Sequence, residues 1–131
     1  MNPILQCSHL TKTFGTKRAL DDINFTINPG RIVGLLGPNG SGKSTFIKTA
    51  NGLLTPSDGS ITICGFPVGI ETKKRVAYLP DKNFLNDSLK ISYYIDFFHD
   101  FYENFDRQKA REMLERLDIQ PDSQLKILSK G

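Results

Sequence analysis

The sequence predicts an α/β fold in which short strands and a glycine-rich loop precede a helical region. An apolar run at residues 32–36 leads into the loop as a buried strand. The run from Lys43 to Ala50 suits a helix that ends at Asn51-Gly52, a glycine-type helix terminus. Beyond Pro80, helical periodicity replaces the strand patterns. We therefore expect a single domain with a β-rich core over residues 1–82 and a helical subdomain over residues 83–131.

The β-rich part contains short strand patterns separated by turns. Runs of strand type occur at residues 4–10, 19–27, 31–36, 60–64 and 75–79. The second run is the clearest, because Ile23, Phe25 and Ile27 share one face at period two. The first run suits an edge strand, and a polar turn over residues 12–17 would follow it.

Two helices are expected in the helical part. From Ser88 to Phe105, apolar and aromatic residues recur at helical spacing. This stripe predicts packing within the subdomain, with a partner-facing surface as the alternative. Asp106 has the residue type of an N-cap, so a second helix is expected from there to about Leu117.

The loop carries the clearest chemical signal in the sequence. It fits the template G-x-x-x-x-G-K-[ST] of a phosphate-binding P-loop. The expected nucleotide-binding residues of this loop are Gly37, Pro38, Asn39, Gly40, Ser41, Gly42, Lys43, Ser44 and Thr45. The alternative is a chance glycine-rich turn, which would match in about 1 in 200 chains of this length, and the strand before the loop and the helix after it lower that figure.

The residue types of the loop explain the chemistry. Glycines allow left-handed backbone angles and a close approach to a ligand. The N–H groups then converge on phosphate oxygens at a helix N-terminus, where the helix dipole favours anions. Lys43 would bind the β- and γ-phosphates, and the Ser44 hydroxyl would ligate Mg²⁺. The sequence therefore predicts a nucleotide-phosphate site.

Composition sets the broad class. The chain has 131 residues, 38% hydrophobic and 24% charged, as in ordinary soluble proteins. The net charge of +3 is too weak to indicate nucleic acid or a membrane surface as a partner. Cys7 and Cys64 lack metal-ligand spacing and are expected to be reduced thiols of a cytoplasmic protein. No apolar run approaches the roughly 20 residues of a membrane span.

The motifs around the loop resemble the nucleotide-binding subunits of bacterial ABC transporters. The segments that carry the resemblance are residues 19–30, 34–40, 52–61 and 78–80, and Leu128-Ser129-Lys130-Gly131, which resembles the start of the ABC signature motif. The resemblance covers essentially the whole chain. It implies a P-loop NTPase core with an N-terminal antiparallel β part, and ATP and Mg²⁺ as cofactors.

The resemblance also assigns roles to residues outside the loop. Phe14 matches the aromatic residue that stacks on adenine, with a core aromatic as the alternative. Asp81 stands where the family carries its Q-loop glutamine; its carboxylate could ligate Mg²⁺, and the alternative is an ordinary loop aspartate. Ser129 and Gly131 match signature residues that contact the nucleotide of the opposite subunit in a head-to-tail dimer, although four residues alone could be a surface turn.

The resemblance implies more residues than the chain contains. In the family, an Asp for Mg²⁺ and a Glu that activates water follow the signature, and a switch histidine comes later. We therefore expect a fragment with its C-terminal strands missing, which alone binds nucleotide weakly and hydrolyses it very slowly. The missing strands would lie between the 31–36 and 75–79 strands, so their absence would leave unpaired edges, completed by another chain or a swapped copy.

Three functions remain open at this point. The first is the ATP-binding subunit of an ABC transporter, coupling ATP binding and hydrolysis to transport. Its implied partners are transmembrane permease subunits and a second ATPase subunit in a homo- or heterodimer, on the inner face of the cell membrane. The second is an ABC-type ATPase that acts on DNA or ribosomes, and the third is a non-catalytic nucleotide-binding module.

Overall fold

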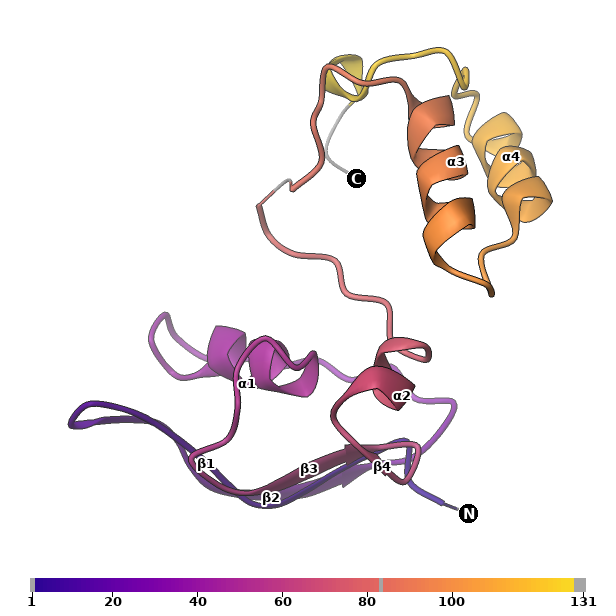
Figure 1. The fold of residues 1–131 in the computed structure, drawn as a ribbon. Coiled ribbons are helices and arrows are strands. Elements are labelled where there is room, and N and C mark those ends of the chain that lie inside the picture. Colours follow the sequence, from indigo (N-terminus) through magenta and orange to yellow (C-terminus); the bar gives the residue numbers. More distant parts are fainter. Residues whose placement is uncertain (1, 83, 129–131) are drawn as a thin grey trace. The chain divides into compact units, whose positions relative to one another are not determined.

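A computed structural model describes residues 2–82 and 84–128. The chain forms two compact units, Met1–Tyr78 and Leu79–Gly131. The first unit holds the sheet and the glycine-rich loop, and the second holds the two longest helices of the C-terminal part (Figure 1). Signature residues Ser129 and Gly131 lie outside the described residues.

The first unit is built on a four-stranded antiparallel sheet with strand order β2-β1-β3-β4. Its strands are β1 (Leu5–Phe14), β2 (Lys17–Ile27), β3 (Asp58–Ile63) and β4 (Phe66–Pro67). The strands predicted at residues 4–10, 19–27 and 60–64 are therefore confirmed. The expectation that the first of them is an edge strand is wrong, because β1 pairs with both β2 and β3.

The predicted polar turn over residues 12–17 is much shorter than expected. β1 continues to Phe14 and β2 begins at Lys17, so only two residues connect the strands. Gly15 has a φ of 58°, which suits a tight hairpin turn. A strand can carry polar side chains where it is exposed to solvent at the end of a hairpin. The polar composition of residues 12–17 therefore predicted a turn where most of the residues belong to strands.

Two predicted buried strands do not form. Residues 31–36 and 76–79 have no regular secondary structure, and Ile32, Leu36 and Leu79 are almost fully exposed. A strand exists only where a neighbour pairs with its backbone, and no segment of residues 2–82 and 84–128 pairs with either run. The apolar runs are real, but the hydrogen bonds that would make them strands are not supplied by the described residues.

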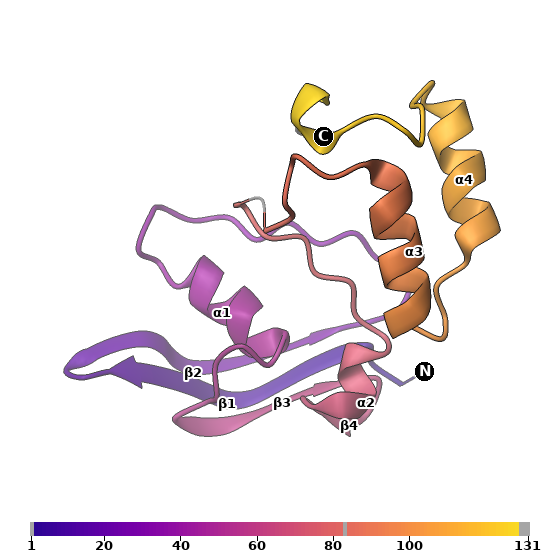
Figure 2. The same cartoon turned by 45° about the horizontal axis from the view of Figure 1, so that its top comes forward.

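Helix α1 (Lys43–Ala50) covers one face of the sheet (Figures 1 and 2). Its bounds agree with the prediction, and Gly52 after it has a φ of 72°. The core beneath consists of Cys7, Leu10, Leu20 and Ile61, with six half-buried apolar residues against it. Phe46 of α1 packs on Phe25 of β2 with ring centroids 5.4 Å apart. This packing fixes the position of the helix N-terminus relative to β2.

A cluster of polar side chains holds an irregularity in the β1–β2 hairpin. His9 and Asp22 both have a φ of 50°, and the strand register shifts around them. His9 Nδ1 lies 2.7 Å from Asp22 Oδ1, and the Asn24 amide donates to the same carboxylate. These hydrogen bonds lower the pKa of Asp22. The Asn24 side chain also accepts from the His9 N–H and donates to the Asp22 carbonyl, so the cluster supplies local partners for a backbone that departs from regular pairing.

The second unit contains α3 (Ile91–Phe101) and α4 (Arg107–Arg116), which lie side by side (Figures 1 and 2). A 3₁₀ turn, η1 (Leu125–Ile127), follows, and a short helix, α2 (Ile70–Lys73), belongs to the first unit. The helix predicted over residues 88–105 is confirmed but is shorter at both ends. The N-cap prediction for Asp106 is confirmed, since its Oδ1 accepts a hydrogen bond from the Lys109 N–H at 2.9 Å.

Part of the aromatic stripe packs within the second unit. Ile91 and Ile95 are buried, and the Phe98 ring lies 5.8 Å from that of Phe105. Phe101 and Tyr102, at the C-terminal end of the stripe, are exposed. The prediction of subdomain packing is therefore confirmed for Ile91, Ile95, Phe98 and Phe105, whereas Phe101 and Tyr102 remain exposed.

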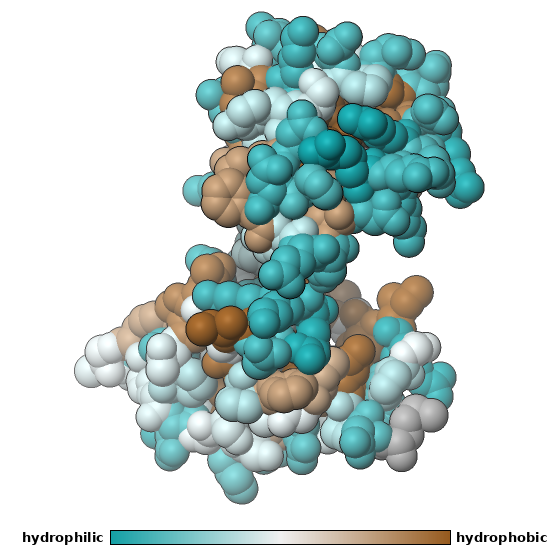
Figure 3. Space-filling model, turned by 45° about the vertical axis from the view of Figure 1, so that its right-hand side comes forward, coloured by the Kyte–Doolittle hydropathy of each residue, from teal (hydrophilic) through white to brown (hydrophobic). Residues whose placement is uncertain are grey.

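Apolar side chains are also exposed on the first unit, where Figure 3 shows patches of hydrophobic residues. In the segment that connects β2 to α1, the exposed large apolar residues are Ile32, Val33, Leu35 and Leu36. None of the helices in the described ranges is long and apolar enough to cross a membrane.

Candidate functional site

The glycine-rich loop joins the irregular segment after β2 to the N-terminus of α1. Gly40 and Gly42 have φ values of 82° and 101°, a region that L side chains rarely adopt. Gly42 is the N-cap of α1, and its carbonyl accepts the first helical hydrogen bond from the Phe46 N–H at 2.8 Å. The left-handed residues therefore end where the helix begins, as the loop motif requires.

Close contacts also restrict the glycines. A Cβ on Gly42 would clash with the carbonyl oxygen of Ala19 in β2. A Cβ on Gly37 would lie 2.7 Å from Ser41 Oγ. The contact at Gly42 involves a backbone oxygen, which cannot rotate away as a side chain could. Glycine at position 42 therefore allows the loop to lie against β2.

The first turn of α1 is open to a ligand. No side chain in the described part of the chain caps the helix, and its first turn contains no acidic residue. The first N–H groups of a helix have no partner within the helix, and the helix dipole gives this end a partial positive charge. The geometry fits an anion such as a phosphate group.

Lys43 adds a full positive charge at the same place. Its Nζ donates hydrogen bonds to the carbonyl oxygens of Gly37 at 2.5 Å and Pro38 at 2.8 Å, and to Ser41 Oγ at 3.3 Å. The ammonium is thus held inside the loop by neutral acceptors. These weak partners can be exchanged for phosphate oxygens, which bind an ammonium group more strongly.

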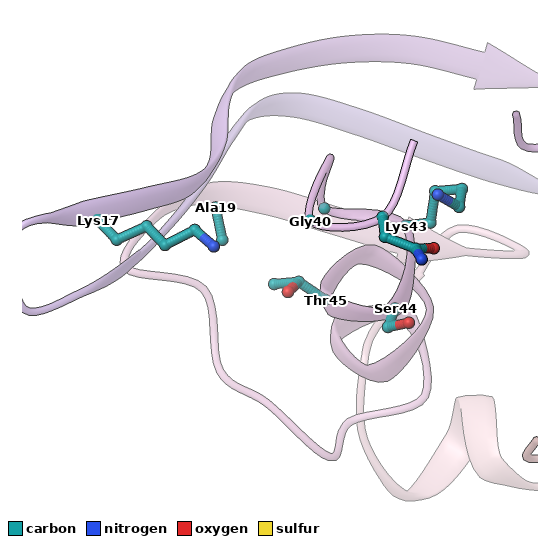
Figure 4. Close-up of a pocket in the computed structure, with 8 residues that line it drawn as sticks. Lys17, Ala19, Gly40, Lys43, Ser44 and Thr45 are labelled. Atoms are coloured by element: carbon teal, nitrogen blue, oxygen red, sulfur yellow. The ribbon is translucent and has the colours of Figure 1, made fainter. Parts of the chain in front are cut away.

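A pocket of about 300 Å³ opens beside the loop (Figure 4). Six of the predicted nucleotide-binding residues line it: Asn39, Gly40, Gly42, Lys43, Ser44 and Thr45. Two further lining residues come from β2, Lys17 and Ala19, and were not predicted. Sequence reasoning missed them because the face of the sheet on which a strand residue lies depends on the strand register. The sequence of one strand does not give that register.

Phe14 lies at the end of β1 and is paired with Lys17 across the hairpin. It is 46% exposed, so much of its ring is accessible. The Lys12 ammonium lies 5.2 Å from the ring centroid, which is a cation–π contact on one face. An exposed ring next to a pocket residue disfavours the alternative of a core aromatic.

The remaining predicted residues do not belong to the first unit. Asp81 is part of the second unit and lies in a segment without helix or strand. Ser129 and Gly131 are outside the described residues. The first unit therefore contains the phosphate loop and Phe14, and the expected metal contact of Asp81 stays a prediction.

Comparisons with known proteins agree on one family. A family model described as "ABC transporter" matches residues 20–131. The zinc import ATP-binding protein ZnuC of Yersinia enterocolitica is 38% identical over 92 residues, which cover 70% of this chain and 34% of that protein. The Nod factor export ATP-binding protein I of Cupriavidus metallidurans is 31% identical over 139 aligned residues, covering 100% of this chain and 46% of that protein. The chain thus spans less than half the length of these relatives.

Solved structures show the same fold. A structure described as the ATP-binding subunit of an ABC transporter aligns with a TM-score of 0.82 and 30% identity, over 98% of this chain and 57% of that one. The cbiO1 protein of Clostridium perfringens, described as part of the ABC transporter complex cbiONQ, aligns with a TM-score of 0.77 and 26% identity, again over 98% and 57%. The predicted α/β fold class of the ABC ATPase type is confirmed.

Proposed function

The chain belongs to the ABC transporter family of ATP-binding proteins, and we propose that it forms the nucleotide-binding part of a subunit that couples ATP binding and hydrolysis to transport across a membrane. The observation that carries this proposal is the loop of residues 37–45, with its left-handed glycines, its internal lysine and its uncapped helix. The permease subunits, and not this chain, would select the transported substrate.

The triphosphate of ATP binds in the loop. Loop N–H groups and the first turn of α1 donate to its oxygens. The Lys43 ammonium would exchange the carbonyls of Gly37 and Pro38 for the β- and γ-phosphates. The Ser44 hydroxyl would hold Mg²⁺, with Asp81 proposed as a further oxygen ligand, and the ion would supply charge neutralisation.

The adenine base stacks on Phe14. A phenylalanine ring offers a flat apolar face and no hydrogen-bonding group, so it binds the base without reading its edges. The Lys12 ammonium already lies on one face of the ring, and the base is proposed to use the other. The neighbouring pocket wall of Lys17 and Ala19 supports this position.

Other subunits complete the proposed transporter. Ser129 and Gly131 contact the nucleotide of a second ATPase subunit, in a homo- or heterodimer. The protein works at the inner face of the cell membrane with transmembrane permease subunits, and nucleic acid is not expected as a partner because the net charge is only +3. The curated relatives are named for import and for export, which favours transport over an ATPase that acts on DNA or ribosomes.

The test is ATP hydrolysis by the purified full-length protein, assembled with its permease partner in vesicles. Lys43→Ala is expected to reduce the rate by about 100-fold or more, because a charge aimed at the transferred phosphate is lost. The matched control is Lys48→Ala, which removes the same charge from an exposed position of the same helix. Equal rates for the two variants would contradict the assignment of the loop.

A further inference from the structure

The β2 side of the pocket carries a charge that the loop motif does not explain. Lys17 lines the pocket at the start of β2, and Figure 4 shows its side chain reaching toward the space that Thr45 of α1 also borders. The lining side chains include two lysines, Lys17 and Lys43, and no carboxylate. A pocket with two cations and no acid is suited to an anion with more than one charged group.

An irregular strand pairing turns Lys17 toward the loop. Lys12 pairs with Leu20, whereas the next residue, Thr13, pairs with Arg18, so Ala19 is an extra residue in β2. Because of this bulge, Lys17 shares a sheet face with Leu20, which is buried under α1. Without it, strict alternation would turn Lys17 to the opposite face.

The same pairing places Phe14 beside Lys17. The two residues are direct partners across the hairpin, and directly opposed residues of an antiparallel pair have side chains on the same face. Lys17 therefore lies beside the ring that is proposed to hold the base, and it also lines the pocket at the helix end that is proposed to hold the phosphates. Lys43, by contrast, is held deep in the loop at Gly37 and Pro38.

We propose that Lys17 is a second cationic contact of the nucleotide, directed at its α-phosphate. This proposal rests on the proposed function of the loop. The α-phosphate is the phosphate nearest the ribose and base, so a lysine adjacent to Phe14 reaches it before the β- or γ-phosphate. Within the described residues, no carboxylate lies within ion-pair distance of Lys17, so its charge is available.

The proposal is tested by equilibrium binding of ATP and ADP to the purified protein. Both nucleotides have an α-phosphate, so Lys17→Ala is expected to lower the affinity for each by the same factor, about fivefold, as for a partly exposed ion pair. This loss of affinity is expected to become smaller as salt is added, because exposed charge interactions are screened. Adenosine, which has no phosphate, is expected to bind the variant and the unchanged protein equally.

The matched control is Arg18→Ala. It removes the same charge from the neighbouring residue, which faces the other side of the sheet and pairs with Asp21 at 2.9 Å. Equal affinities of the Lys17 and Arg18 variants would overturn the inference, as would a loss confined to ATP. If the unchanged protein binds neither nucleotide, the proposed function itself fails, so the two failures are distinguishable.

Discussion

At the scale of single residues, Gly42 connects the sheet to the phosphate loop. Its φ of 101°, and the clash that a Cβ at this position would make with the Ala19 carbonyl, leave no room for a side chain. The motif predicted a glycine here for its backbone angle. The contact with β2 was not predictable, since it depends on the bulge that brings the Ala19 carbonyl to this point.

Gly42→Ala is expected to lower the free energy of unfolding by about 2 kcal/mol or more, because left-handed strain and a backbone clash add together. ATP binding should be lost with it. Gly15→Ala is the control, since Gly15 also has a positive φ but would place its Cβ in open space. Urea unfolding of both variants measures the difference. Equal costs would show that the contact with β2 is unimportant.

The two cysteines should differ in reactivity. Burial raises the pKa of the Cys7 thiol to about 11, whereas Cys64 is exposed. The thiolate is the nucleophile that attacks a thiol reagent, so one cysteine should react at pH 8 in the folded protein and both after unfolding. Cys64→Ser should abolish the reaction of the folded form. Rapid modification of two thiols in the unchanged protein would contradict the buried position of Cys7.

The raised pKa of Cys7 also gives a direction for pH dependence. An unfolded chain would ionise this thiol near its ordinary pKa of 9.0, and the folded protein near 11. The contribution of this thiol to the free energy of unfolding is therefore fully present below pH 9. It is lost as the pH rises toward 11. Alkaline unfolding of Cys7→Ala should show a weaker pH dependence over this interval.

At the scale of elements, local signals predicted the helices well. The bounds of α1 followed from the loop before it and the glycine after it, and Asp106 marked the start of α4. The segments at 31–36 and 75–79 were predicted as strands from their apolar runs, which was wrong. A helix contains its own hydrogen-bond partners, whereas a strand depends on a neighbour that its sequence does not specify.

Asp106→Ala should destabilise the second unit by about 1 kcal/mol, because the N–H of Lys109 loses its acceptor. Asp106→Asn keeps a side-chain oxygen in the same place and should cost much less. Helix content followed by circular dichroism during urea unfolding distinguishes the two variants. A loss of similar size for both would indicate that the charge, and not the cap, stabilises α4.

At the scale of the whole molecule, the fold class and family were predictable because several motifs occur in a fixed order. The antiparallel sheet, the loop and the helical region all appear in the structure, and the family match covers residues 20–131. The Lys17 side of the pocket was not predictable. It arises from a register shift between β1 and β2, and register is a property of two strands together.

The central claim is that the loop N–H groups and the start of α1 bind the phosphates of ATP. The most direct measurement is the change in backbone amide NMR shifts when MgATP is added to the protein. The largest changes are expected at Gly40, Gly42 and Ser44, and Lys43→Ala should abolish them. Changes centred elsewhere in the chain, or changes that survive Lys43→Ala, would contradict the account.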